Sequence, residues 1–208
     1  SSLDQCRMLG IARASLDKNS FYGLRFIIEK CNDLDASRLR EVGPDRACAE
    51  WLLRCRGTVR FDDDSPEFAE YYHFAQAMEA RKGDDAARKA FLTHVRANDA
   101  CITARGCKHF EGVSKLHDVN FSGCKNLDDE AIDMFVNNVG ESLHSFELSN
   151  CRLVTPDGLR LLGKCSNLSL LVLTDLPQIT AHDWEELMAE LKQELPTDCN
   201  ISSNVSRM

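Results

Sequence analysis

The sequence lacks several common enzyme motifs and any segment long enough to span a membrane. It contains no Gly-rich phosphate loop, no HExxH helix and no GxSxG elbow, the motifs that would raise the expectation of catalysis. No apolar run approaches the roughly 18 residues that a membrane-spanning helix requires. Basic residues are too few for a general nucleic-acid-binding protein, since 25 Lys and Arg stand against 33 Asp and Glu, a net charge of -8. The acidic balance suits a partner with a basic surface better than a nucleic acid.

The ten cysteines follow neither a metal-binding nor a disulfide pattern. No CxxC pair occurs, and several cysteines fall on apolar stripes where a thiol behaves as a small buried hydrophobe, so we expect thiols in a reducing compartment. Cys101, Cys107 and His109 have a C-x5-C-x-H spacing, which is not a usual zinc knuckle and lacks a fourth ligand. A catalytic Cys–His pair would need a pocket and an orienting group that no sequence shows. We therefore predict no catalytic residue, no metal and no cofactor.

One spacing of apolar residues recurs from residue 116 onward: a position, then plus three, plus two, plus three and plus three. The instances are Leu116, Val119, Phe121, Cys124 and Leu127; Leu143, Phe146, Leu148, Cys151 and Val154; Leu168, Leu171, Leu173, Leu176 and Ile179. The repeat lengths of 27 and 25 residues lie within the range of leucine-rich repeats, in which alternate residues of a short strand enter the core. The pattern predicts an α/β fold, a short leucine-rich-repeat solenoid of the cysteine-containing type.

Helix signals lie between the predicted strands. Asp128 and Asp129 precede one apolar helical stripe, and Thr155-Pro156-Asp157 opens another. A degenerate first repeat fits Leu92, Val95, Ala97 and Ala100, and Cys199-Asn200-Ile201 fits a closing half-strand. Since single repeats cannot bury their own faces, we expect three or more stacked units within a repeat domain at residues 91–208.

Residues 1–90 show no such period and are predicted to form a mainly helical region that caps the repeats. A helix starting at Gly43-Pro44-Asp45 has a stripe of Cys48, Trp51, Leu52 and Cys55 and ends at Gly57. Val59 and Phe61 alternate like a short strand. Asp62-Asp63-Asp64 reads as an acidic turn rather than a metal site, because consecutive acids point in different directions. It leads into a helix that should include the residues Phe68, Tyr71, Tyr72, Ala75 and Met78.

Two runs in this region, residues 39–47 (LREVGPDRA) and 50–55 (EWLLRC), resemble the signature of the mitochondrial ATP synthase subunit s (coupling factor B) family. The resemblance covers roughly residues 20 to 200. It implies an accessory protein without an active site, peripheral to the mitochondrial inner membrane on its matrix side. Such a protein would bind membrane-sector or stalk subunits of ATP synthase and support proton-coupled ATP synthesis. The chain departs from the family at Ser122, which replaces one of two nearby thiols that members carry there.

Two alternatives stay open. A paralogous branch of the family resembles an assembly factor for the membrane arm of respiratory complex I and shows the same opening motif in weaker form. Cysteine-type repeats also occur in substrate adaptors of ubiquitin ligases, although the F-box-like helical motif that accompanies them is not recognisable in this chain.

Seven residues are candidate partner contacts: Phe21, Leu24, Arg25, Arg46, Trp51, Arg54 and Arg56. The first three belong to residues 21–28, an apolar segment that would lie on a membrane surface, dock on a transmembrane subunit, or pack against the N-terminal region. The arginines at 46, 54 and 56 lie off the stripe of their helix and would meet an anionic partner or lipid headgroup, or be solvated. Trp51 lies on the stripe and is either a binding hot spot or core. The concave strand face includes Asn120, Glu147 and Val172, and these side chains do not identify a ligand.

Overall fold

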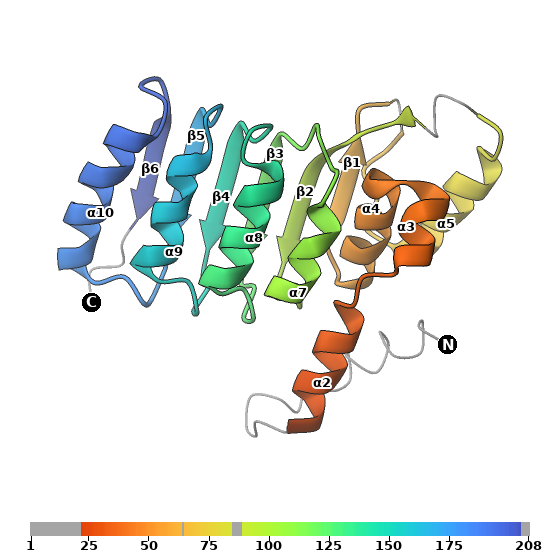
Figure 1. The fold of residues 1–208 in the computed structure, drawn as a ribbon, viewed down its shortest axis with the longest axis horizontal. Helices are drawn as coiled ribbons and strands as arrows, with labels where there is room; N and C mark the ends of the chain where they lie inside the picture. Colours follow the sequence, from red (N-terminus) through yellow and green to blue (C-terminus); the bar gives the residue numbers. More distant parts are fainter. Residues whose placement is uncertain (1–21, 64, 85–88, 205–208) are drawn as a thin grey trace.

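The computed structural model describes residues 22–63, 65–84 and 89–204 and has an α/β architecture built on one mixed six-stranded sheet (Figure 1). The strands are β1 (Thr58–Phe61), β2 (Leu92–Asn98), β3 (Asp118–Ser122), β4 (Ser145–Ser149), β5 (Leu170–Thr174) and β6 (Asn200–Asn204). Their order in the sheet is their order in the sequence. β1 pairs antiparallel with β2, and every later pairing is parallel.

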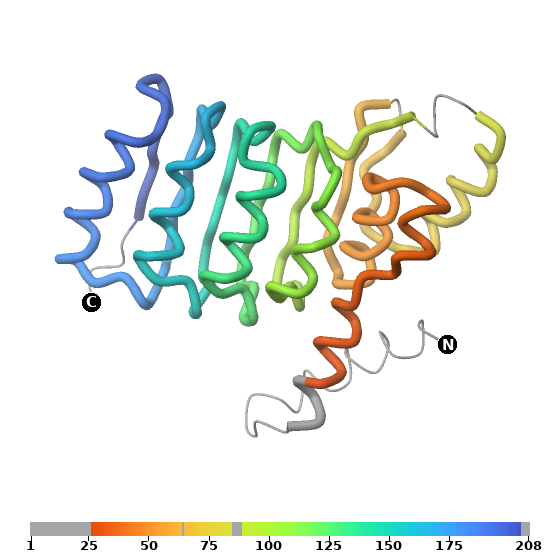
Figure 2. Tube along the Cα trace, viewed as in Figure 1, coloured from red at the N-terminus to blue at the C-terminus, as the bar shows by residue number. Residues whose placement is uncertain are grey.

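The helices fall into two groups along this sheet. They are α2 (Tyr22–Cys31), α3 (Ala36–Val42), α4 (Pro44–Arg54), α5 (Tyr71–Ala80), α7 (Ala104–Cys107), α8 (Asp129–Val139), α9 (Pro156–Arg160) and α10 (Ala181–Glu194), with 3-10 turns at Lys108–Phe110 and Leu161–Lys164. From α7 to α10 they lie side by side along one side of β2 to β6 (Figure 1). α3, α4 and α5 gather at the β1 end, and α2 extends away from the sheet below α4 (Figure 2).

Each repeat of the sequence pattern corresponds to one step from a strand to its neighbour in the sheet. Val119 pairs with Phe146, which pairs with Leu171, and the same register holds along the rest of β3 to β5 without a bulge. Side chains of a strand alternate between its two sides, so aligned strands place the same repeat position in the core each time. All fifteen repeat positions are at most 9% exposed. The predicted strand, turn and helix units are confirmed, as are the strand of the degenerate first repeat and the closing strand after Cys199.

The turns that leave the strands also repeat. Four residues with positive φ donate their backbone N–H to a carbonyl of the neighbouring strand or turn: Asp99 to Ser122 (2.6 Å), Gly123 to Ser149 (2.9 Å), Asn150 to Thr174 (3.0 Å) and Asp175 to Asn204 (3.4 Å). Asp and Asn tolerate this left-handed conformation better than other residues with a Cβ. Gly123 is required for a second reason, since a Cβ there would lie 2.6 Å from an oxygen of the Asp99 carboxylate.

The N-terminal region follows its sequence pattern except at Phe68. α4 begins at Pro44, directly after Gly43 with φ 84°, and its predicted stripe is buried. β1 forms where Val59 and Phe61 predicted a strand, and it joins the same sheet as the repeats. The prediction that Phe68 lies on the following helix is wrong. Phe68 and Val59 exchange two backbone hydrogen bonds of 2.9 Å, so the chain is still extended at Phe68 and α5 starts only at Tyr71.

Asn32, just after α2, ties that helix to the loop after β2. Its side chain is fully buried and donates to the carbonyls of Ile28 and Cys101, both at 2.8 Å, while its Oδ1 accepts from the Thr103 N–H at 3.4 Å. Gly106 lies against it, because a Cβ at Gly106 would be 2.0 Å from the Asn32 Oδ1. Buried polar groups of this kind cost stability when unpaired, so the three bonds fix where α2 leaves the body.

Candidate partner-binding surface

The side of the sheet away from the core presents aligned rows of side chains, which we call the open sheet face. Its members on β1 to β5 are Thr58, Arg60, His94, Arg96, Asn98, Asp118, Asn120, Ser122, Ser145, Glu147, Ser149, Leu170, Val172 and Thr174. On β3, β4 and β5 these residues alternate with fully buried ones. The face is charged over β1 to β4 and apolar or hydroxyl-bearing over β5, so it offers a partner polar and apolar contacts side by side.

A chain of polar contacts crosses the charged part of this face. The Arg60 guanidinium donates to the His94 ring, whose Nε2 also lies 3.0 Å from an oxygen of Asp118. On the next row the Asn120 amide donates to the Glu147 carboxylate. Burial lowers the pKa of His94, against the opposing attraction of Asp118 and with the help of nearby Arg60. Arg60 can only donate, so its contact requires an unprotonated Nε2 as the acceptor, whereas the Asp118 oxygen beside the same nitrogen favours a protonated ring.

A hollow of about 270 Å³ lies between these rows and contains an unsatisfied acceptor. It is lined by His94, Arg96, Asp118, Asn120 and Glu147, among others. The Oδ1 of Asn120 is inaccessible and has no hydrogen-bond donor among the described residues. An unmatched buried acceptor is destabilising by about 1–3 kcal/mol, and because this oxygen has no accessible surface, a partner's donor does not reach it in this conformation.

The structure separates the sequence-predicted contact residues rather than gathering them. Phe21 lies outside the described residues, and Leu24 and Arg25 belong to the first turns of α2, where the side chains are not described. Further along the same helix, Phe26 is 64% exposed, with the Lys30 ammonium 5.9 Å from the centre of its ring. Residues 21–28 therefore include an exposed aromatic ring, and a cation from the following turn of α2 lies beside it.

Trp51 packs in the core. Its side chain has no exposed surface, and its indole stacks on the His109 ring with centroids 4.6 Å apart and meets Phe110 edge-on. The sequence left open whether Trp51 is a binding hot spot or a core residue. Its position is that of a core residue, because a side chain without exposed surface cannot touch a partner.

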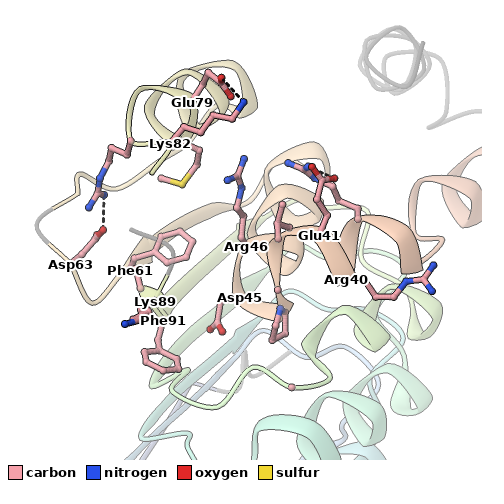
Figure 3. Close-up of a pocket in the computed structure, with 18 of the residues that line it drawn as sticks. Arg40, Glu41, Asp45, Arg46, Phe61, Asp63, Glu79, Lys82, Lys89 and Phe91 are labelled. Atoms are coloured by element: carbon pink, nitrogen blue, oxygen red, sulfur yellow. Dashed lines mark hydrogen bonds and ion pairs between the residues drawn. The ribbon is translucent and has the colours of Figure 1, made fainter. Parts of the chain in front are cut away.

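The three arginines differ in how they are held. The Arg46 Nε donates to the Glu50 carboxylate at 3.1 Å. Arg38 donates two hydrogen bonds to the same carboxylate, at 2.8 and 2.6 Å. The Nε of Arg54 donates to the Glu50 carbonyl at 3.1 Å. Arg56 is exposed and has φ 72° in the turn before β1. Arg46 is the one that reaches into a cavity (Figure 3).

The sequence analysis missed the part of the open sheet face that lies on β1 and β2. It found Asn120, Glu147 and Val172 but not Arg60, His94 or Arg96, because the first repeat is degenerate and β1 precedes it. A signal was present, since His94 and Arg96 alternate with the buried Val95 and Ala97. That the sheet continues into β1 is a tertiary fact, so Arg60 could not have been added.

The Cys107 and His109 pair has the electrostatics of a core, not of a nucleophile and base. Burial raises the pKa of the Cys107 thiol. Burial also lowers the pKa of His109 to about 4, although the ring hydrogen-bonds the Gly106 carbonyl at 3.0 Å. A catalytic thiol needs a lowered pKa, so both groups are uncharged packing elements near neutral pH.

Comparison with known proteins finds relatives along most of the chain. It is 28% identical to ATP synthase subunit s, mitochondrial, of Bos taurus over 193 residues, which is 92% of either chain. It is 29% identical to the protein of the same name from Homo sapiens over 88% of this chain and 86% of the human one. For that of Mus musculus the identity is 32% over 80% of this chain and 79% of the mouse one. No protein-family model matches. Among the described helices, none combines the length and apolar composition needed to cross a membrane.

Proposed function

The chain belongs to the mitochondrial ATP synthase subunit s family, and we propose on that basis that it is an accessory, non-catalytic subunit of the mitochondrial ATP synthase. The observation that carries this proposal is the similarity to relatives of that name over 79 to 92% of their own length. The similarity therefore includes both the N-terminal region and the repeats, not one widely shared module.

The proposal includes the repeat type. The 25- and 27-residue period, the buried cysteines at the ninth position and the parallel one-to-one register support leucine-rich repeats of the cysteine-containing type, stacked as a short solenoid. The thiol of Cys124 donates to the Ala97 carbonyl at 3.2 Å, satisfying a backbone group of the preceding repeat. In this division residues 1–90 form the helical region and cap, and residues 91–208 form the repeat domain.

The mechanism is binding. The open sheet face would contact a stalk or membrane-sector subunit of the synthase, with Glu147, Asp118 and Arg96 giving charge complementarity and Leu170 and Val172 an apolar contact. Residues 21–28 and the arginines 46, 54 and 56 would hold the protein at the matrix side of the inner membrane, peripheral to the bilayer. Held there, it would support proton-coupled ATP synthesis without taking part in its chemistry.

The test is native gel separation of mitochondrial membranes solubilised in mild detergent, with the tagged chain quantified across the gel by mass spectrometry. Co-migration with mature ATP synthase is the expected result. Abundance in partial complex I bands alone would replace the proposal by the assembly-factor reading, and a cytosolic location would favour the ligase adaptor.

A charge reversal on the open sheet face tests the surface itself. Glu147→Lys should reduce the co-migrating fraction, because its carboxylate lies on the open sheet face, between Asn120 and Val172. Glu130→Lys is the matched control, since it makes the same charge change at an exposed position in the first turn of α8. Equal loss for both variants, or for neither, would argue against the open sheet face as the contact.

A further inference from the structure

The two ends of the sheet differ in whether the outer edge of the last strand is covered. At the β1 end, Val59 and Phe68 exchange two backbone hydrogen bonds of 2.9 Å, so the segment at Phe68 covers that edge. At the other end β6 is the last strand of the sheet, and no described strand pairs with its outer edge (Figure 1). An uncovered edge presents backbone N–H and C=O groups that can pair with another strand.

The backbone groups of Ile201 and Ser203 face the uncovered side of β6. Asn200 donates its N–H to the Ser169 carbonyl at 2.8 Å, and the Asn204 carbonyl accepts from the turn after β5 at 3.4 Å. Alternate residues of a strand direct their backbone groups to opposite edges, so Ile201 and Ser203 direct theirs away from β5. The strand has none of the usual edge protection, since it contains no charge and no proline and pairs with β5 without a bulge.

The helix beside this edge, α10, is incompletely covered on the side turned away from α9. Its α9 side is identified by Glu190, which pairs with Arg160 at 2.6 Å. With about 3.6 residues per turn, Met188 lies almost opposite Glu190, and Trp184 lies about a third of a turn from it. Trp184 and Met188 pack against the core but keep some exposed surface, as does Ile201 of β6. A neighbour placed beside β6 would therefore cover apolar surface as well as the strand edge.

The charges on this side of α10 are complementary to themselves under a two-fold rotation. Glu185 precedes Met188 by three residues and Lys192 follows it by four, and both charged side chains are exposed. Neither forms a salt bridge within the part of the chain that the structure describes. In two α10 helices packed antiparallel and crossing at Met188, Glu185 of each helix lies beside Lys192 of the other. Contacts that repeat in this way are those of a symmetric dimer.

We propose that β6 and α10 form the interface of a homodimer, in which a second copy of this chain covers the open edge. A two-fold axis normal to the sheet and passing beside Ser202 pairs the two β6 strands antiparallel. Ile201 of one copy then lies opposite Ser203 of the other, and the outward N–H and C=O groups of both residues find partners. The two sheets become one continuous sheet.

The same rotation places the two α10 helices side by side on one side of the joined sheet. Trp184 and Met188 of each copy are then covered by those of the other, and Glu185 meets Lys192 across the axis. The interface is separate from the open sheet face, so it does not depend on the subunit function proposed above.

The experiment measures the molar mass of the purified full chain by sedimentation equilibrium over a range of concentrations. A reversible equilibrium between monomer and dimer is expected. Glu185→Lys should weaken dimerisation about tenfold or more, because it brings like charges together at both symmetric positions. Adding Lys192→Glu to this variant should restore the dimer, since the exchanged charges are again complementary. This rescue distinguishes a lost contact from misfolding.

Glu186→Lys is the matched control, since it makes the same charge change at the neighbouring exposed position of α10, which faces away from the proposed contact. It should leave dimerisation unchanged. Ser203→Pro tests the strand, because it removes an outward N–H and spares the pairing with β5, so it should yield a folded monomer. A chain that stays monomeric at every concentration, or a dimer that Glu185→Lys and Glu186→Lys weaken equally, would overturn the proposal.

Discussion

The Trp51 indole and the His109 imidazole lie face to face, with ring centroids 4.6 Å apart and planes 8° from parallel. The contact joins α4 of the N-terminal region to the turn before β3, so it links the two parts of the chain across one core. Burial favours a neutral ring here, because a charged imidazole would be taken out of water.

His109 should therefore make the protein acid-sensitive. Its folded-state pKa of about 4 lies below the unfolded value near 6.5, so the unfolded chain binds the proton first as pH falls. The stability that the neutral ring contributes is complete above pH 6.5 and is lost as the pH falls from 6.5 to 4. At pH 5 the loss amounts to about 2 kcal/mol. Urea unfolding at pH 7 and pH 5 should show a larger loss for the wild type than for His109→Gln. Equal losses for the two proteins would contradict this.

Asn32→Ala should destabilise the attachment of α2. It removes two 2.8 Å hydrogen bonds from a fully buried side chain and leaves the Ile28 and Cys101 carbonyls without that donor, a cost of about 2–3 kcal/mol. Trypsin cleavage at Lys30 should accelerate as well. Asn138→Ala is the control, because Asn138 makes a single local bond to the Met134 carbonyl and should cost under about 1 kcal/mol. A similar cost for both would show that Asn32 does not anchor the helix.

Gly158→Ala should cost more than Gly163→Ala, although an added Cβ at either site meets a carboxylate oxygen at 2.1 Å. At Gly158 that oxygen belongs to Asp129, which is fixed by accepting from the Thr155 N–H at 2.9 Å and its hydroxyl at 2.6 Å. At Gly163 it belongs to Glu194, an exposed long side chain that can rotate. We expect a loss of about 2 kcal/mol or more at Gly158 and under about 1 at Gly163, by chemical denaturation. The reverse order would refute the bonding argument.

Glu50→Gln should be strongly destabilising, because Glu50 is 4% exposed and compensates both Arg38 and Arg46. Removing one partner of a buried pair costs about 3–5 kcal/mol, reduced here to about 2–3 since both arginines are partly solvated. Glu41→Gln breaks another contact to Arg38. Because the Glu41 side chain is 69% exposed, the change in stability should be under about 0.5 kcal/mol. Thermal unfolding of the two variants side by side measures the difference, and equal midpoints would exclude a structural role for Glu50.

The N-terminal half shows where local patterns stop being informative. The stripe at Cys48, Trp51 and Cys55 predicted α4, because a helix period is a local property. The pattern misplaced Phe68, since an apolar residue before a helix looks the same whether it joins that helix or pairs with a strand. Its partner, Val59, is nine residues away, and that pairing decided the outcome.

By itself the sequence determined the repeating units, the side of each strand that is buried and the family, because these follow from spacing and from residue identity. The tertiary structure decided what lies side by side across the chain: β1 joined to the repeat sheet, Arg60 beside His94, and Trp51 on His109. Such contacts join residues 34 to 58 positions apart, and their energy depends on burial and geometry that only the folded chain creates.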